Sequence, residues 1–170
     1  MKKFELTAEF VTNVFGKKLF RIKALVAFCN VEKGELGGFI EKEDNLSHDD
    51  NAWVYGNAQV SGNAWVSGNA QVSGNAQVFD NAQVSGDADY AVVAGFGRYF
   101  RTTTFFRCKD KILRVQCGCF YGDLAQFREI VKKTHGDSKY AKEYLAIADL
   151  MELHFSDKCG GEQMNDGKIY

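Results

Sequence analysis

The chain has 170 residues, with 21 Lys and Arg against 22 Asp and Glu and a formal net charge of −1. This length suits one compact unit with small appended parts. The sequence has neither a secretory leader nor an apolar run of about 18 residues, so we expect a cytoplasmic protein that does not span a membrane. Five cysteines, an odd number, favour free thiols over a disulfide framework.

The near-neutral total hides three segments of different charge. Residues 1–34 carry seven Lys or Arg against three Glu, a net +4. Residues 35–90 carry one Lys against nine acidic residues, a net −8, and residues 91–170 carry thirteen against ten, a net +3. An acidic centre argues against that centre following a nucleic-acid backbone. Nucleic acid or a nucleotide is therefore only a secondary expectation as a partner.

Residues 1–34 are predicted to form an N-terminal β cap. Phe4, Leu6 and Phe10 belong to one apolar run, and residues 19–22 begin a second. The segment Asn13–Gly16 lies between them and has turn composition, so the pattern predicts a β-hairpin. Repeat proteins need terminal caps that cover the exposed end of the core, and we assign that role to the hairpin.

Residues 51–86 are six tandem copies of Asn-Ala-x-Val-x-Gly, in which only Asp80 breaks the last column. Ala and Val are two positions apart, which is strand spacing. The Gly-Asn pair that follows tolerates left-handed backbone angles and suits a corner. We therefore expect short strands that stack in parallel, with residues three hexads apart on one face. The residues predicted to fill the interior are Val54, Val60, Val66, Val72, Val78 and Val84.

The period continues back to about residue 36 in degraded form, so the repeat region is assigned to 35–90. Counting in sixes places Ile40 and Leu46 in the Ala column, and Lys42 and His48 in the Val column. Two polar residues would then face the interior, so we expect this first part to be irregular. The repeat stops at Tyr90, and residues 91–97 are interpreted as a linker or an apolar lid.

Residues 91–155 are predicted to form a ββαα module. Residues 98–120 suggest a hairpin that turns at residues 109–111, followed by helices from Asp123 to about Lys133 and from about Ser138 to His154. The predicted apolar stripe of the first helix is Leu124, Phe127, Ile130 and Val131, and that of the second is Tyr144, Ile147, Ala148 and Met151. Residues 156–170 are polar and Gly-rich, and we expect a flexible tail.

The alternation of residues along this hairpin assigns its two faces. The apolar face is predicted to hold Phe100, Phe106, Cys108, Leu113, Val115, Cys117 and Cys119. The opposite face is predicted to hold Tyr99, Arg101, Phe105, Arg107 and Arg114. The cysteines lack CxxC spacing, so we interpret them as core residues and expect no metal site.

The repeat columns resemble those of the hexapeptide-repeat, left-handed β-helix proteins, over about a third of the chain. The resemblance implies a mainly β fold: a short left-handed β-helix with the N-terminal hairpin cap and the C-terminal ββαα module. The strings GGFIEKEDNLSHDDNAWVYGNAQVSGNA, TTTFFRCKD and HGDSKYAKEYLA also look like a group of poorly characterised phage and prophage proteins of similar build.

Many members of the hexapeptide-repeat family are acyltransferases with a His base beside a cleft between subunits. His48 is the only histidine in the repeat region, and the sequence assigns it no carboxylate partner. Other members bind zinc through three His from adjacent coils, which this chain lacks. We therefore expect no catalytic residue, metal or cofactor, and keep an acyltransferase with His48 as base as the alternative.

Four aromatic residues interrupt the outward Gln and Ser positions of the repeats: Trp53, Tyr55, Trp65 and Phe79. Either the caps of the same chain cover them, or they form a contact surface, since such residues are favoured anchors at interfaces. Self-association as a dimer or trimer is common in the resembling family and is the first expectation for that surface. Capture of a foreign partner is the second.

The hairpin face with Tyr99, Arg101, Phe105, Arg107 and Arg114 combines cations with aromatic rings. This combination suits phosphate, an acidic protein surface or stacked bases. Alternatively, the helices pack on this face and the arginines pair with Glu129 or Glu152.

The leading hypothesis is a non-enzymatic, phage- or prophage-encoded binding protein that engages a host macromolecule in the host cytoplasm, for example as an inhibitor of host defence of the anti-CRISPR type. The alternatives are a hexapeptide-repeat acyltransferase acting at a subunit interface, and a protein that sequesters an anionic small molecule with Arg101, Arg107 and Arg114.

Overall fold

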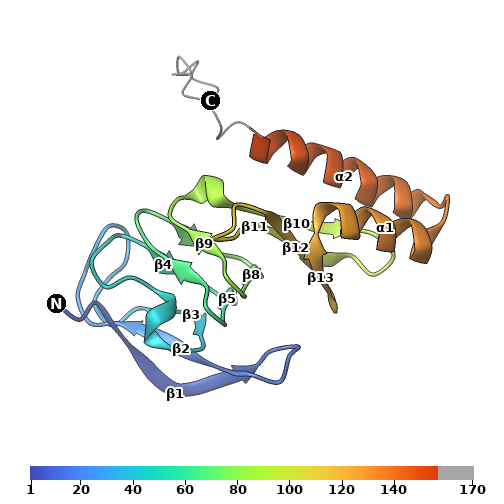
Figure 1. Cartoon of the computed structure of the whole chain (residues 1–170). Coiled ribbons are helices and arrows are strands. Elements are labelled where there is room, and N and C mark those ends of the chain that lie inside the picture. Colours follow the sequence, from blue (N-terminus) through green and yellow to red (C-terminus); the bar gives the residue numbers. More distant parts are fainter. Residues whose placement is uncertain (157–170) are drawn as a thin grey trace.

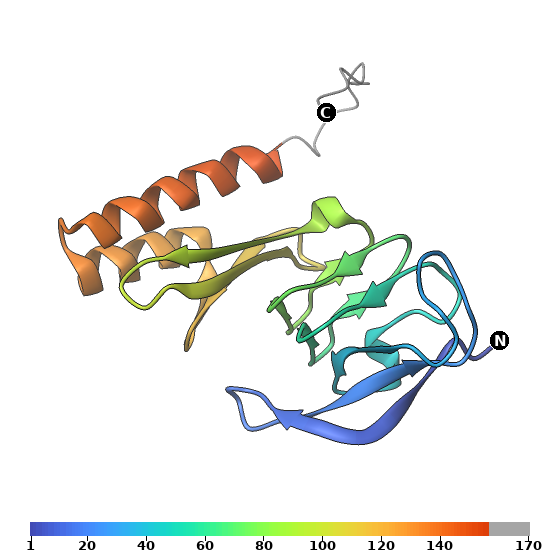
Figure 2. The same ribbon diagram turned by 180° about the vertical axis from the view of Figure 1, so that it is seen from behind.

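The computed structural model describes residues 1–156, which form a mainly β fold with two helices at the C-terminal end (Figures 1 and 2). The first nine strands are β1 (Phe4–Thr12), β2 (Lys18–Ala24), β3 (Leu36–Ile40), β4 (Trp53–Val54), β5 (Gln59–Val60), β6 (Trp65–Val66), β7 (Gln71–Val72), β8 (Gln77–Val78) and β9 (Gln83–Val84). They are followed by β10 (Tyr90–Phe96), β11 (Arg101–Arg107), β12 (Leu113–Cys117), β13 (Phe120–Asp123), α1 (Leu124–His135) and α2 (Lys139–Ser156). The tail predicted for 156–170 lies outside the described residues, apart from Ser156.

The six hexads pair in three separate parallel ladders. β4 pairs with β7, β5 with β8, and β6 with β9, so that Val54 lies beside Val72 as predicted from the three-hexad spacing. The valine and alanine of every hexad are at most 1% exposed. The predicted burial of the Val column is thereby confirmed, and these methyl groups form the main part of the first hydrophobic core.

The corners between hexads use left-handed backbone, which is why glycine recurs there. Gly62 and Gly68 have φ of +68° and +62°, and a Cβ on either would lie 2.9 Å or less from the backbone of the neighbouring hexad. Asp80 stands where the fifth hexad lacks glycine and adopts the same conformation, with φ of +61°. Asp is one of the few non-glycine residues that tolerate this region.

Residues 36–46, which precede the hexads, do not have the column register that counting in sixes predicts. Ile40 pairs with Val60 and Leu46 bridges to Val66, and both are at most 1% exposed. Ile40 and Leu46 therefore continue the Val column, and Lys42 and His48 lie outside it, so the column assignment was wrong. The reason is a longer corner at 47–51, which shifts the register by two residues.

The backbone of the first three hexads exposes its carbonyl groups toward the N-terminal segment. The strands of these three hexads donate their N–H groups to the last three hexads, for example from Trp53 to the Ala70 carbonyl. Their own carbonyls face the N-terminal segment and need donors from outside the hexads. The buried Lys3 ammonium donates to the carbonyl of Ala52 at 2.8 Å. The Asn45 side-chain amide donates to the carbonyl of Ala64 at 2.9 Å. Side chains thus replace a missing strand.

The last three hexads expose N–H groups, and acceptors meet them. The Asp87 carboxylate accepts from the Gln71 N–H, and the Thr104 hydroxyl oxygen accepts from the Gln77 N–H. Asp89 accepts from the Ser85 N–H at 3.0 Å. The C-terminal sheet therefore supplies part of the cap at this end.

The N-terminal hairpin is present as predicted, with β1 and β2 antiparallel. Its Asn13 side chain accepts from the N–H groups of Phe15 and Lys17 and closes the turn. β2 pairs with β3, which joins the β5–β8 ladder, so the hairpin continues a five-stranded sheet into the repeats. Figures 1 and 2 show it at the opposite end of the repeats from the C-terminal sheet.

The C-terminal part has four strands in the order β10-β11-β12-β13, and not the two that the sequence suggested. Residues 91–97, interpreted as a linker or an apolar lid, lie mostly in β10. Ala91 pairs with Phe105 and Val93 with Thr103, and both apolar residues pack in the core beneath the helices. β13 supplies the second missed strand.

The predicted alternation along β12 is confirmed, since Leu113, Val115 and Cys117 share the helix side, but the predicted faces of β11 were wrong. Phe105 lies opposite Val115, and both are buried on the helix side, whereas Phe106 lies opposite Arg114 and packs on the repeat side. Cys108 also joins the repeat-side core. An error of one residue between paired strands moves every side chain to the other face.

The two helices start and end within two residues of the predicted positions. Asp123 caps α1 by accepting from the Gln126 N–H at 2.8 Å, and Gly136 ends it. In α1, Phe127 is buried as expected, but Ile130 is 37% exposed. The expected apolar stripe of α2 is buried and consists of Tyr144, Ile147, Ala148 and Met151. No helix in residues 1–156 is long and apolar enough to cross a membrane.

The interior column provides a stability test. Val60 lies between Ile40 and Val78 in the ladder and is fully buried. Replacing it with alanine leaves a cavity and should lower the free energy of unfolding by about 1–3 kcal/mol. Gln59→Ala on the same strand should change it by less than about 0.5 kcal/mol. Urea unfolding of both variants measures the difference, and equal losses would contradict the inward orientation of the column.

Candidate functional site

Two of the four outward aromatic residues of the repeats are covered by the chain itself. Trp53 is fully buried, with the rings of Phe4 and Phe28 edge-on at 6.3 and 5.4 Å. Phe79 is 8% exposed and lies 4.6 Å from the Tyr121 ring. These two residues therefore contribute packing rather than an open contact surface.

The other two retain some access to solvent. Trp65 is 40% exposed on β6. Tyr55 is half-buried and packs against the first core, and burial raises its pKa above the usual value. Of the four aromatic residues in the repeats, Trp65 is therefore the one best placed to contact another molecule.

The predicted basic hairpin face is divided by the true register. Arg107 donates to the Phe155 carbonyl at 2.7 Å and lies 3.7 Å from Asp89, so it joins β11 to α2. Arg114 pairs with Asp110 at 2.7 Å. The Glu129 or Glu152 pairing considered from the sequence does not occur for these two, and Phe105 is fully buried. Three of the five proposed residues therefore have structural roles.

The remaining two lie in the connection between β10 and β11, which we call the β10–β11 tip and define as residues 95–101. Tyr99 is 64% exposed, and the guanidinium groups of Arg98 and Arg101 lie 5.6 and 5.1 Å from its ring centroid. Phe96 and Phe100 are 44% and 72% exposed. Within residues 1–156, neither arginine has a carboxylate within 4.0 Å.

The tip is held in a defined conformation. The Gly97 N–H donates to the Glu143 carboxylate of α2 at 2.9 Å. A Cβ at Gly97 would overlap the Tyr144 hydroxyl, so glycine is required there. Phe100 adopts φ of +52°, a left-handed conformation that costs a non-glycine residue about 1–2 kcal/mol. An aromatic residue held exposed at such a cost makes the tip a candidate contact surface.

Sequence reasoning found Tyr99 and Arg101 but missed Arg98, Phe96 and the exposure of Phe100. The available signal was the pair of glycines at positions 95 and 97, which marks a turn inside an apolar run. Because residues 91–97 were interpreted as a linker or an apolar lid, this turn was not assigned to a sheet.

A pocket of about 310 Å³ lies beneath the tip, between the helix side of the C-terminal sheet and α1. Its walls are mainly apolar, and burial raises the pKa of the Tyr144 phenol in its wall to about 12. The pocket is lined by Arg98, Tyr99, Arg101, Cys117, Cys119, Phe120, Phe127, Ile130, Val131, Thr134, His135 and Tyr144.

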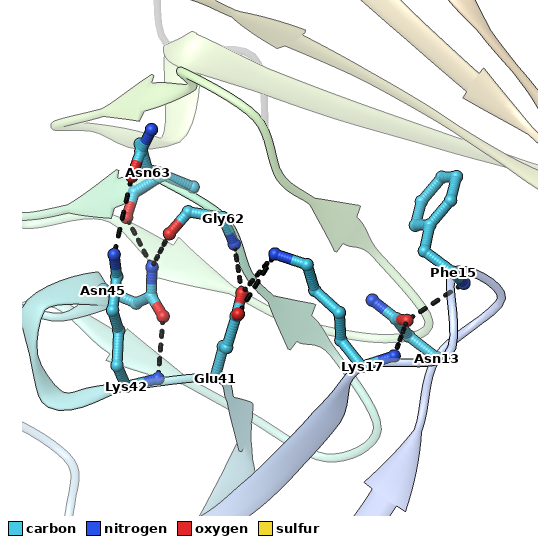
Figure 3. Close-up of polar contacts among 9 residues, drawn as sticks. Asn13, Phe15, Lys17, Glu41, Lys42, Asn45, Gly62 and Asn63 are labelled. Atoms are coloured by element: carbon cyan, nitrogen blue, oxygen red, sulfur yellow. Dashed lines mark hydrogen bonds and ion pairs between the residues drawn. The ribbon is translucent and has the colours of Figure 1, made fainter.

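A second pocket of about 420 Å³ lies between the N-terminal hairpin turn and the repeats. Figure 3 shows its main polar link: the Glu41 carboxylate accepts from the Gly62 N–H at 2.6 Å and from the Lys17 ammonium at 3.0 Å. On the other wall, Asp80 accepts from the Tyr121 hydroxyl. These polar groups around the pocket are therefore paired within the chain. These contacts hold the N-terminal hairpin and the C-terminal sheet against the repeats.

His48 has a carboxylate neighbour that the sequence did not reveal. Its Nε2 lies 3.6 Å from the Glu43 carboxylate, and its Nδ1 accepts from the Lys3 N–H at 3.1 Å. The ring also stacks on Phe4 at 4.1 Å. Nδ1 is thus occupied by a backbone hydrogen bond, and Nε2 faces a carboxylate.

The cysteines are distributed over different environments. Cys108 is buried, which raises the pKa of its thiol to about 11, whereas Cys117 is half-buried and Cys119 exposed. Through residue 156, no group of three His, Cys, Asp or Glu side chains is arranged to hold a metal ion.

Comparison of the chain with protein-family models and with curated proteins gives no match. The site must therefore be interpreted from its own geometry.

The Glu41 link predicts a pH-dependent contribution to stability. Partial burial favours the neutral form, but the Gly62 N–H and Lys17 outweigh it and lower the pKa of Glu41 below 4.5. Because the folded-state pKa is lowered, this contribution is present above pH 4.5 and is lost as the pH falls through the folded value. Glu41→Gln should therefore cost about 1–3 kcal/mol at pH 7 and progressively less in acid.

Glu43→Gln is the matched control, since Glu43 pairs with Lys2 on the surface at 42% side-chain exposure. It should cost less than about 1 kcal/mol at pH 7. Denaturant unfolding at a series of pH values measures both variants. A loss for Glu41→Gln that does not change with pH would show that the carboxylate charge is irrelevant.

Proposed function

We propose that the protein is a non-enzymatic binding protein that engages a macromolecular partner through the β10–β11 tip. The observation that carries this proposal is the exposed group of Phe96, Tyr99 and Phe100, flanked by two arginines without carboxylate partners in the described chain. Aromatic residues and arginine dominate the binding energy at protein interfaces. The partner is expected to present an acidic surface with apolar depressions.

We further propose that the repeat region winds as a short, three-sided β-helix. The 18-residue register of the three ladders and the buried Val column support this proposal. The left-handed sense comes from the resemblance to hexapeptide-repeat proteins. In this arrangement the β-helix is a rigid support, and the C-terminal module presents the contact surface.

The origin and target follow from the second resemblance. We propose that the chain is phage- or prophage-encoded and acts in the host cytoplasm on a host macromolecule, as an inhibitor of host defence of the anti-CRISPR type. The strings that resemble phage proteins overlap the start of the repeats, β11 and the α1–α2 connection. A tip that binds an acidic protein surface is compatible with this role.

Self-association as a dimer or trimer is a separate proposal. Trp65, 40% exposed on a strand of the repeats, is the feature that favours it. This surface is distinct from the tip, so a self-associated form would leave the tip available.

The two alternatives receive different support. An acyltransferase would need His48 as base, and its Nδ1 already accepts a hydrogen bond from the Lys3 backbone. A protein that sequesters an anionic small molecule would have to use Arg101 without Arg107 and Arg114, because those two are paired within the chain. The macromolecular binding role is therefore preferred.

The tip predicts the behaviour of a charge-reversal variant. Arg98→Glu/Arg101→Glu should reduce capture of a stoichiometric partner from host lysate at least tenfold, because it opposes an acidic surface. Lys109→Glu/Lys111→Glu makes the same charge change on the exposed β11–β12 turn and should retain the partner. Quantitative mass spectrometry of the captured proteins measures both. Clean isolation of the wild-type chain without a partner, or equal loss in both variants, would argue against this function.

A further inference from the structure

The pocket beneath the β10–β11 tip has features that macromolecular binding does not require. It is walled by side chains from α1 and β13, chiefly Phe120, Phe127, Ile130 and Val131. Its volume of about 310 Å³ falls at the lower end of the range for small-molecule sites, roughly 300–1,000 Å³. The rings of Phe120 and Phe127, with centroids 5.6 Å apart, form an aromatic wall of this pocket.

The charge at the mouth of this pocket is entirely positive. Arg98 and Arg101 line it, and none of its lining residues is Asp or Glu. The nearby Glu143 is already bound to the Gly97 N–H and lies 3.7 Å from Lys139. The guanidinium groups therefore keep their donors for an anion, and arginine recognises carboxylates through paired hydrogen bonds.

We propose that this pocket binds an organic carboxylate with a flat apolar body. The body lies against Phe120 and Phe127, and the carboxylate meets Arg98 and Arg101 at the mouth. This site does not depend on a macromolecular partner, because every group that forms it belongs to the chain itself. It also differs from the set of arginines that the sequence suggested, of which it keeps only Arg101.

A matched pair of probes isolates the role of the charge. Naphthalene-2-carboxylate and naphthalene-2-carboxamide share the same rings, and only the first is an anion. Titration of the purified chain by calorimetry should show that the carboxylate binds at least tenfold more tightly than the amide. In Arg98→Gln/Arg101→Gln the ratio should fall close to one, whereas in Lys109→Gln/Lys111→Gln it should be unchanged.

The alkylation rates of two exposed cysteines test where the probe binds. Cys119 lines the pocket, and Cys29 is exposed in the N-terminal part of the chain. Saturating naphthalene-2-carboxylate should slow alkylation of Cys119 by iodoacetamide several-fold and leave that of Cys29 unchanged, as followed by peptide mass spectrometry. Wild-type chain that does not bind the carboxylate, binds acid and amide equally, or shows no protection of Cys119 would overturn the proposal. These measurements use no lysate, so their failure would leave macromolecular binding by the tip untouched.

Discussion

The direction of the backbone hydrogen bonds in the repeats constrains the rest of the structure. The strands of the first three hexads donate their N–H groups to carbonyls of the last three, so one end of the ladders presents carbonyls and the other presents N–H groups. Buried backbone groups must find partners. The front end is therefore met by donors, Lys3 and Asn45, and the back end by acceptors, Asp87 and Thr104. The N-terminal segment and the C-terminal sheet complete the repeats chemically, in addition to covering them.

The requirement at the front end is strong enough to bury a cation. Lys3 is 3% exposed, and burial lowers its pKa to about 8 against the opposing pull of Asp50 and Asp49. Its ammonium is retained because it donates to the carbonyls of Asp50 and Ala52, where a neighbouring strand would otherwise pair. The same segment holds His48 in place through the Lys3 N–H, which donates to the imidazole Nδ1.

This architecture separates the cations that are paired within the chain from those that can contact another molecule. Arg107 joins β11 to α2, Lys17 joins the N-terminal hairpin to Glu41, and Arg114 pairs with Asp110 in the adjacent turn. Arg98 and Arg101 lie on a turn that α2 holds through Glu143, and they retain donors for another molecule. Among the arginines of residues 1–156, only Arg98 and Arg101 have no ion pair. The arginines therefore favour the C-terminal sheet, and not the acidic repeats, as the part of the molecule that binds a partner.

The sequence by itself determined what is local or periodic: the hexad spacing that buries the valines, the N-terminal hairpin, the Asp123 cap and most of the two helical stripes. Of the candidate site, it identified Tyr99 and Arg101. Tertiary structure decided the faces of β11, the register of residues 36–46, the covering of Trp53 and Phe79, and the pairing of Arg107 and Arg114. The physical reason is that a side chain's face depends on strand pairing, in which a shift of one residue reverses the outcome. Its exposure depends on elements that lie far away in the chain, and no period in the sequence encodes either.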